Sequence, residues 1–187
     1  RGLGDVYKRQ GENAAFCNHM KNILVAKYGA AEGCLKESRI RHSMGVANFL
    51  FAYAKSHDWS KEETEDLYLT GLLHDIGYID NPKGTDHGRL GAEILKRNGL
   101  NAEICELISC HGRFIENPSR KQALLWLADL CVNRDGDYIG YQKRYESIKE
   151  RYKNDPERLF QVYRILEYLQ IHFSAVSYTH LRAHETP

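Results

Sequence analysis

The chain lacks the features that mark several common classes of protein. Its 187 residues contain no apolar run long enough to cross a membrane and no visible secretion signal, so we expect no membrane association. The five cysteines form no Cys-x-x-Cys pair, which favours a reducing cytoplasm as the compartment. No glycine loop of the dinucleotide-binding or Walker type is present, so a tightly held nucleotide cofactor is not implied.

The chain also lacks an excess of charge of either sign. Lys and Arg number 26 and Asp and Glu number 25, which leaves a formal charge of +1 and no global field toward nucleic acid or an anionic membrane. An anionic substrate must therefore be attracted locally. The densest run of charge is expected to be a solvated helix face with i, i+4 pairs, and it comprises Lys143, Arg144, Glu146, Lys149, Glu150, Arg151 and Lys153.

Apolar residues recur at helical spacing throughout, and no segment is typical of a strand. Helix-starting residues precede several of these segments, including a capping box at Ser60 and a cap with first-turn proline at Asp155-Pro156. We therefore expect an all-α, single-domain helical bundle. The expected helices cover residues 13–28, 38–57, 60–76, 88–98, 101–111 and 122–132, with two more within 138–173.

An adjacent His74 and Asp75 interrupt an apolar sequence beside Leu72, Leu73 and Ile76. A bare charged group in such surroundings costs several kcal/mol unless something pairs with it, and a divalent cation is a suitable partner. Asp129 poses the same problem, because it follows Ala128 with no cationic side chain close by in the sequence. Three further histidines lie on other segments expected to be helical, namely His42, His87 and His111.

The predicted ligand set has four histidines and two carboxylates, counting Asp75 and Asp129. Such a set suits Fe, Mn, Co, Ni or Zn better than Mg or Ca, which prefer oxygen ligands alone. The order of these six residues and the local sequence around each of them resemble the HD superfamily of metal-dependent phosphohydrolases in its two-metal form. The resemblance covers roughly residues 37–135 and rests on five segments: Arg39–Ala47, Leu72–Gly77, His87–Leu95, Ile108–His111 and Leu127–Asp129.

The resemblance implies a role for each ligand. His42, His74, Asp75 and Asp129 would hold one ion, and Asp75 would also bridge to a second ion held by His87 and His111. A water shared by two ions about 3.5 to 4 Å apart would lose a proton near neutral pH and attack phosphorus. Asp75 is thus a catalytic candidate.

Nearby cations would compensate charge on the leaving group in this scheme. Arg113 and Lys83 are the catalytic candidates for that role, Arg89 is a further candidate, and Arg39 would support a ligand or contact phosphate.

Two departures from the family bear on the substrate. Tyr78 stands where many members carry Lys, and Gly112 stands where some two-metal members carry a second histidine. A small phosphorylated substrate, possibly a nucleotide, is expected, as for a diadenosine tetraphosphatase or a general nucleotide or phosphomonoester hydrolase. Metal identity and oligomeric state stay open.

Two other functions use the same ligands. A few members of the superfamily hold mixed-valent di-iron and activate O₂, so an oxygenase is one alternative. A regulatory module that binds metal with little turnover is the other.

The two ends of the chain resemble translated sequencing-adapter sequence. We assign residues 1–10 and 176–187 to such non-native segments, which makes His180 and His184 accidental, and we assign 11–175 to the helical domain. A genuine basic tail is the alternative.

Overall fold

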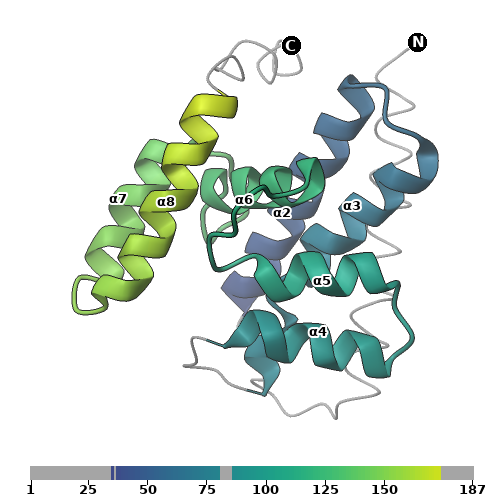
Figure 1. Ribbon diagram of the computed structural model, residues 1–187, viewed down its shortest axis with the longest axis horizontal. Helices are drawn as coiled ribbons and strands as arrows, with labels where there is room; N and C mark the ends of the chain where they lie inside the picture. The colour runs from purple at the N-terminus through teal and green to yellow at the C-terminus, as the bar shows by residue number, and fades with distance from the viewer. Residues whose placement is uncertain (1–34, 36, 81–85, 174–187) are drawn as a thin grey trace.

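The structure is a computed structural model, and it describes residues 35, 37–80 and 86–173 (Figure 1). Within these residues it contains α-helices and one 3-10 helix, and its only β-type pairing is an isolated bridge between Val132 and Tyr138. The predicted all-α fold is confirmed. The elements are α2 (Glu37–Ser56), α3 (Lys61–Leu73), η1 (Ile76–Ile79), α4 (His87–Arg97), α5 (Ala102–Cys110), α6 (Arg120–Cys131), α7 (Tyr141–Arg151) and α8 (Pro156–His172).

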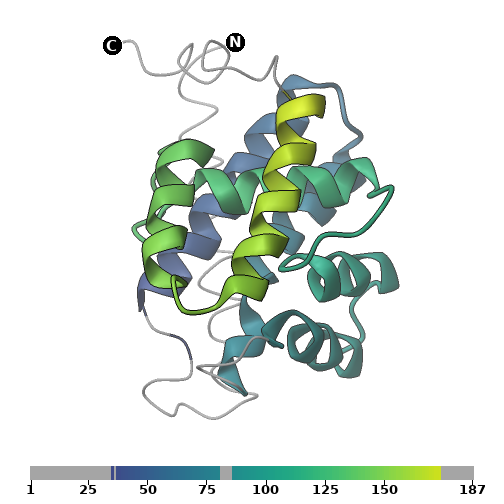
Figure 2. The ribbon, with the colours of Figure 1, turned by 60° about the vertical axis from the view of Figure 1, so that its left-hand side comes forward.

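Helix α6 lies at the centre of the bundle. It contacts α2, α3, α5, α7 and α8, while α2 packs along α3 and α4 packs along α5. Figures 1 and 2 show α7 and α8 together on one side of the bundle and α4 and α5 at its lower end. No helix among the described residues is both long and apolar enough to cross a bilayer.

Several helices begin where the sequence predicts. Ser60 forms the predicted capping box with Glu63, and Asp155 caps α8 just before Pro156. Asn101 and Ser119 each accept a hydrogen bond from the first turn of the following helix. These side chains satisfy backbone N–H groups that have no partner inside the helix.

The helix that leads into the His-Asp pair is shorter than predicted. The expected helix over 60–76 ends at Leu73, and a 3-10 turn follows from Ile76 to Ile79. This turn brings the backbone of Gly77 against α4, so closely that a Cβ atom there would lie 2.5 Å from the backbone nitrogen of Gly91. The expectation of a continuous helix was wrong because tertiary contact with α4 requires the chain to turn before Gly77.

The hydrophobic core has two parts. One cluster joins α2, α3, α6 and α8 around Leu50, Trp126 and Leu166, and the other joins α3, η1, α4 and α5 around Leu73 and Ile108. Since α3 contributes to both clusters, the residues that follow Leu73 lie where the two parts meet. Cys105 and Cys131 are buried, and Cys110 is half-buried.

Some predictions fall outside the described residues. They are the helix over 13–28, the terminal segments 1–10 and 176–187 with His180 and His184, and Lys83.

The approach of α2 to α3 depends on Gly71. A Cβ atom at this position would lie 2.7 Å from Ala47 Cα and 2.8 Å from its backbone nitrogen. Alanine normally stabilises a helix interior by about 1 kcal/mol relative to glycine. Here we expect Gly71→Ala to lower the free energy of unfolding by about 1 to 3 kcal/mol in urea denaturation, because the helices must move apart. A gain in stability would contradict this packing.

Candidate metal centre

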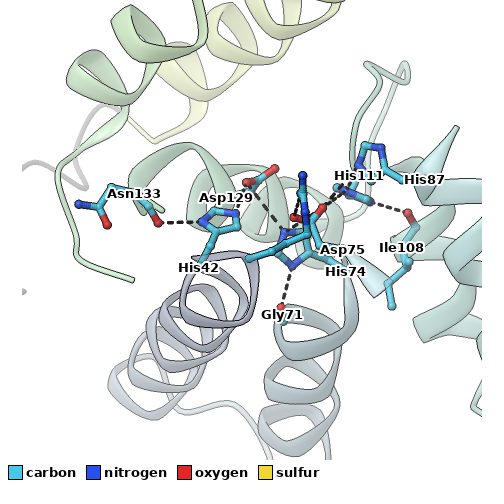
Figure 3. A network of polar contacts seen from close by, with 10 residues as sticks. His42, Gly71, His74, Asp75, His87, Ile108, His111, Asp129 and Asn133 are labelled. Atoms are coloured by element: carbon cyan, nitrogen blue, oxygen red, sulfur yellow. Dashed lines mark hydrogen bonds and ion pairs between the residues drawn. The ribbon is translucent and has the colours of Figure 1, made fainter. Parts of the chain in front are cut away.

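The six predicted ligand residues converge from five segments of the chain (Figure 3). His42 lies on α2, His74 and Asp75 directly follow α3, and Asp129 lies on α6. His87 is the first residue of α4, and His111 directly follows α5. Their donor atoms fall into overlapping groups of three, and the atoms within each group lie within 4.8 Å of one another. The groups are His42, His74 and Asp75; His74, His111 and Asp129; and Asp75, His87 and His111.

Backbone carbonyls fix the orientation of three of the imidazoles. His74 Nδ1 lies 2.7 Å from the carbonyl oxygen of Gly71, and His111 Nδ1 lies 2.6 Å from that of Ile108. His42 Nδ1 lies 3.0 Å from the carbonyl oxygen of Asn133. Because a carbonyl only accepts hydrogen bonds, each Nδ1 carries the proton. In the neutral rings, each Nε2 therefore offers a lone pair, as metal ligation requires.

The lone pair of His74 faces negative charge. Its Nε2 is buried and has no hydrogen-bond partner within the described part of the chain, and it lies 3.7 Å from Asp75 Oδ1 and 3.9 Å from Asp129 Oδ1. His42 Nε2 lies 2.9 Å from the same Asp129 oxygen. A lone pair and a carboxylate repel each other in a buried site unless a cation or a proton lies between them. The residues present therefore fit a cation.

A second group of donors surrounds the other side of Asp75. His87 Nε2 and His111 Nε2 lie 3.0 Å apart, and they lie 3.5 Å and 3.6 Å from Asp75 Oδ1. Ligand atoms that each lie about 2.1 Å from one cation are about 3.0 to 3.4 Å apart at right-angle to tetrahedral geometry. These separations are compatible with a shared ion.

The protonation states of the carboxylates suit ligation. Burial alone would raise the pKa of Asp75, but the neighbouring imidazoles, His74 first among them, hold it well below its usual range. Burial likewise opposes ionisation of Asp129, but the neighbouring imidazoles, His42 first among them, lower its pKa. Both groups are carboxylates at neutral pH and present negative oxygens to the centre.

Burial acts on the imidazoles in the opposite sense. It lowers the pKa of His74, and it lowers the pKa of His87 to about 3, so both rings favour the neutral form. Burial disfavours the charge on His111 too, but the nearby carboxylates, Asp75 first among them, outweigh it and raise the pKa of that ring.

Arg39 and Tyr78 hold the centre from one side. Arg39 Nη1 donates to Asp75 Oδ2 at 2.7 Å, so only Oδ1 of Asp75 faces the three histidines. The Arg39 guanidinium lies 3.3 Å from the centroid of the Tyr78 ring. The Tyr78 ring in turn stacks on the His87 ring, with 4.0 Å between the two ring centroids. Tyr78 thus orients a predicted ligand on one face and the partner of Asp75 on the other.

A cavity of about 230 Å³ opens beside the centre. His42, Asp75, His87, His111 and Asp129 line one side, and residues of α7 and α8 line the other. Arg113 is exposed, does not line this cavity, and points Nη2 toward Cys110 Sγ. Arg89 is paired with Asp86 and Glu93 outside the cavity, so the geometry supports neither arginine in the role predicted for it.

The sequence reasoning missed four arginines that line the cavity. They are Arg134, Arg144, Arg151 and Arg158. The expectation of a solvated face was wrong at Arg144, which is buried together with Ile148 one turn later on α7. The i, i+4 spacing of Arg144 from Ile148 was the available signal, because both lie on the inward face of the helix.

The profile of the HD domain family matches residues 39–169, which is more than half of the chain. Over 92 residues the chain is 35% identical to Ribonuclease Y from Fervidobacterium nodosum, covering 44% of this chain and 18% of that protein. Over 77 residues it is 31% identical to uncharacterized protein MJ0778 from Methanocaldococcus jannaschii, covering 40% of this chain and 45% of that protein. The matches thus span less than half of either relative. No solved structure gave a match.

Replacement of Tyr78 tests whether its ring supports the centre. We expect Tyr78→Leu to weaken metal affinity about 10- to 100-fold, because His87 and Arg39 lose the surface on which they lie. Tyr78→Phe keeps the ring and is the matched control, with affinity close to that of the wild type. Competition with a chelator, followed by elemental analysis, measures both. Equal affinities for the Leu and Phe variants would contradict the role of the ring.

The pKa of His87 predicts a pH dependence of stability in metal-free protein. Because burial lowers this pKa from 6.5 to about 3, the unfolded chain binds the proton at higher pH than the folded one. The free energy of unfolding therefore falls as the pH drops from about 6.5 toward 3. We expect His87→Gln to lose about 1 to 2 kcal/mol less than the wild type between pH 7 and pH 4.5 in urea denaturation. Identical losses would show that His87 is not buried in its neutral form.

Proposed function

Because the chain belongs to the HD domain family, we propose that it is a metal-dependent phosphohydrolase that cleaves a phosphate ester or anhydride of a nucleotide or small phosphorylated metabolite. HD domain proteins are generally metal-dependent hydrolases. The observation that carries the proposal is the buried lone pair of His74 Nε2, which faces Asp75 and Asp129 and has no hydrogen-bond partner among residues 35, 37–80 and 86–173.

Two overlapping sets of ligands would hold the metal. One set has Asp75 with His87 and His111, and the other has His42, His74, Asp75 and Asp129. We infer Fe, Mn, Co, Ni or Zn, since imidazole and carboxylate donors suit these ions. When bound, such cations lower the pKa of water toward neutrality and offset negative charge on phosphate oxygens.

The protein's own groups would prepare the site for that chemistry. Arg39 holds one oxygen of Asp75, so the other oxygen keeps a fixed direction toward the histidines. Backbone carbonyls keep the Nε2 atoms of His42, His74 and His111 directed inward, so little reorganisation is needed when a substrate binds. Ile148 and Ile165 form part of the cavity wall and present apolar side chains to it.

The relatives leave the substrate open. Ribonuclease Y acts on RNA by its name, but the similarity covers only 18% of that protein. The formal charge of +1 also gives this chain no general attraction to a nucleic acid. We therefore propose a small phosphorylated substrate in place of RNA.

A substrate screen tests the function. Purified protein is assayed for metal content, reloaded with the metal found, and incubated with nucleotides and other phosphorylated metabolites. We expect metal-dependent phosphate release, and we expect Asp75→Asn to lower kcat/KM more than about 100-fold, because a predicted ligand is lost. Asp80→Asn removes an exposed carboxylate nearby and is the matched control, with activity unchanged.

Three results would contradict the proposal. They are phosphate release that survives chelation, full turnover by Asp75→Asn, and O₂ uptake by iron-loaded protein with no phosphate release. The last result would favour the oxygenase alternative.

A further inference from the structure

Arg144 is a buried cation without an ion-pair partner among the residues that the structure describes. It lies on α7, is 7% exposed, and lines the cavity beside the metal centre. Its Nε makes no hydrogen bond, and the described part of the chain provides no carboxylate in an ion pair with it. Such a group is costly to bury unless an anion joins it.

One oxygen of each carboxylate that lines the cavity already has a close partner other than Arg144. Asp75 Oδ2 pairs with Arg39, and Asp129 Oδ1 lies 2.9 Å from His42 Nε2. Burial lowers the pKa of Arg144, and the charge of Asp129 opposes this change only in part. The folded chain therefore leaves a positive site next to the metal centre.

Neighbouring arginines add to this charge. Arg134 and Arg151 line the same cavity, and neither forms an ion pair within the described residues. Arg158 lines it from α8, and its Nε lies 4.0 Å from Asp155 Oδ2. The lining thus carries five arginines, Arg39 included, against Asp75 and Asp129, although the whole chain has a formal charge of only +1.

We propose that Arg144 is the centre of a second anion site, and that the substrate carries at least two phosphate groups. One phosphate lies at the metal centre, and the other binds Arg144 with help from Arg134, Arg151 and Arg158. A guanidinium suits this role because its N–H groups match two phosphate oxygens at once. The inference rests on the proposed function, because it specifies the substrate of the same cavity.

The cavity favours a small substrate over a nucleic acid chain. Its volume is about 230 Å³, below the usual range of roughly 300 to 1,000 Å³ for ligand sites. Ile148, Val162 and Ile165 close it on the side of α7 and α8. A compact diphosphate, or the phosphate chain of a nucleotide, fits this shape.

The test compares how metal-loaded protein binds two probes, inorganic phosphate and pyrophosphate. Calorimetry gives both affinities, and metal content is measured before and after because pyrophosphate chelates divalent cations. We expect Arg144→Met to weaken pyrophosphate binding at least about 10-fold and phosphate binding less than about 3-fold. Arg144→Lys keeps the charge and should give an intermediate loss. Lys143→Gln, at an exposed position on the same helix, is the matched control and should bind as the wild type does.

A purely structural role for Arg144 predicts a different pattern. If the arginine stabilised the fold, Arg144→Met would lower the melting temperature of ligand-free protein. If it serves an external anion, removal of an unpaired buried charge leaves the melting temperature equal or higher.

Three outcomes would overturn the inference. They are equal affinity of wild type and Arg144→Met for pyrophosphate, a lower melting temperature with no selective loss of pyrophosphate, and Arg144-dependent binding of a single-stranded oligoribonucleotide without binding of pyrophosphate. In a further outcome, Arg144→Met loses pyrophosphate binding selectively while the wild type hydrolyses no phosphate ester or anhydride. That result would support the anion site and reject only the proposed hydrolysis. Hydrolysis by the wild type, with pyrophosphate binding unchanged in Arg144→Met, would support the proposed function and reject the anion site.

Discussion

The arrangement of the site depends on one carboxylate oxygen. Asp75 Oδ1 lies within 3.7 Å of the Nε2 atoms of His74, His87 and His111, while Asp75 Oδ2 is held by Arg39. Backbone carbonyls hold the Nδ1 atoms of two of these rings, which directs their lone pairs toward negative charge. A cation would remove that repulsion, so binding of a metal at this buried polar centre would be coupled to folding.

The helical framework supplies each donor at a position where a helix begins, ends or crosses the centre. Helix α3 ends at Leu73, so His74 and Asp75 leave the regular helix and direct both side chains inward. The tight turn at Gly77 then brings the start of α4, with His87, next to them. Helices α7 and α8 cover the opposite side and contribute arginines and aliphatic residues to the cavity. The histidine and carboxylate cluster and the arginines of α7 and α8 thus line the same cavity.

Local signals explain how far the sequence could predict this structure. The capping box at Ser60 and the cap at Asp155 are short-range features, and both helices begin where expected. His74, Asp75 and Asp129 are predictable ligands because they interrupt apolar sequence, and the resemblance to the HD superfamily adds His42, His87 and His111. The fold brings all six residues together. The early end of α3 depends on contact between Gly77 and α4, which no local pattern encodes. The run of charged residues around Arg144 predicts an exposed position, but its i, i+4 spacing from Ile148 places it on the buried face of α7.

Anomalous X-ray diffraction from crystals of the metal-loaded protein tests the central claim most directly. Data collected on both sides of the absorption edge of the bound metal locate the ion without any assumption about activity. The account predicts a peak about 2.0 to 2.3 Å from both His74 Nε2 and Asp75 Oδ1. An absence of any peak among the six residues, with His74 Nε2 hydrogen-bonded to another protein group, would contradict it.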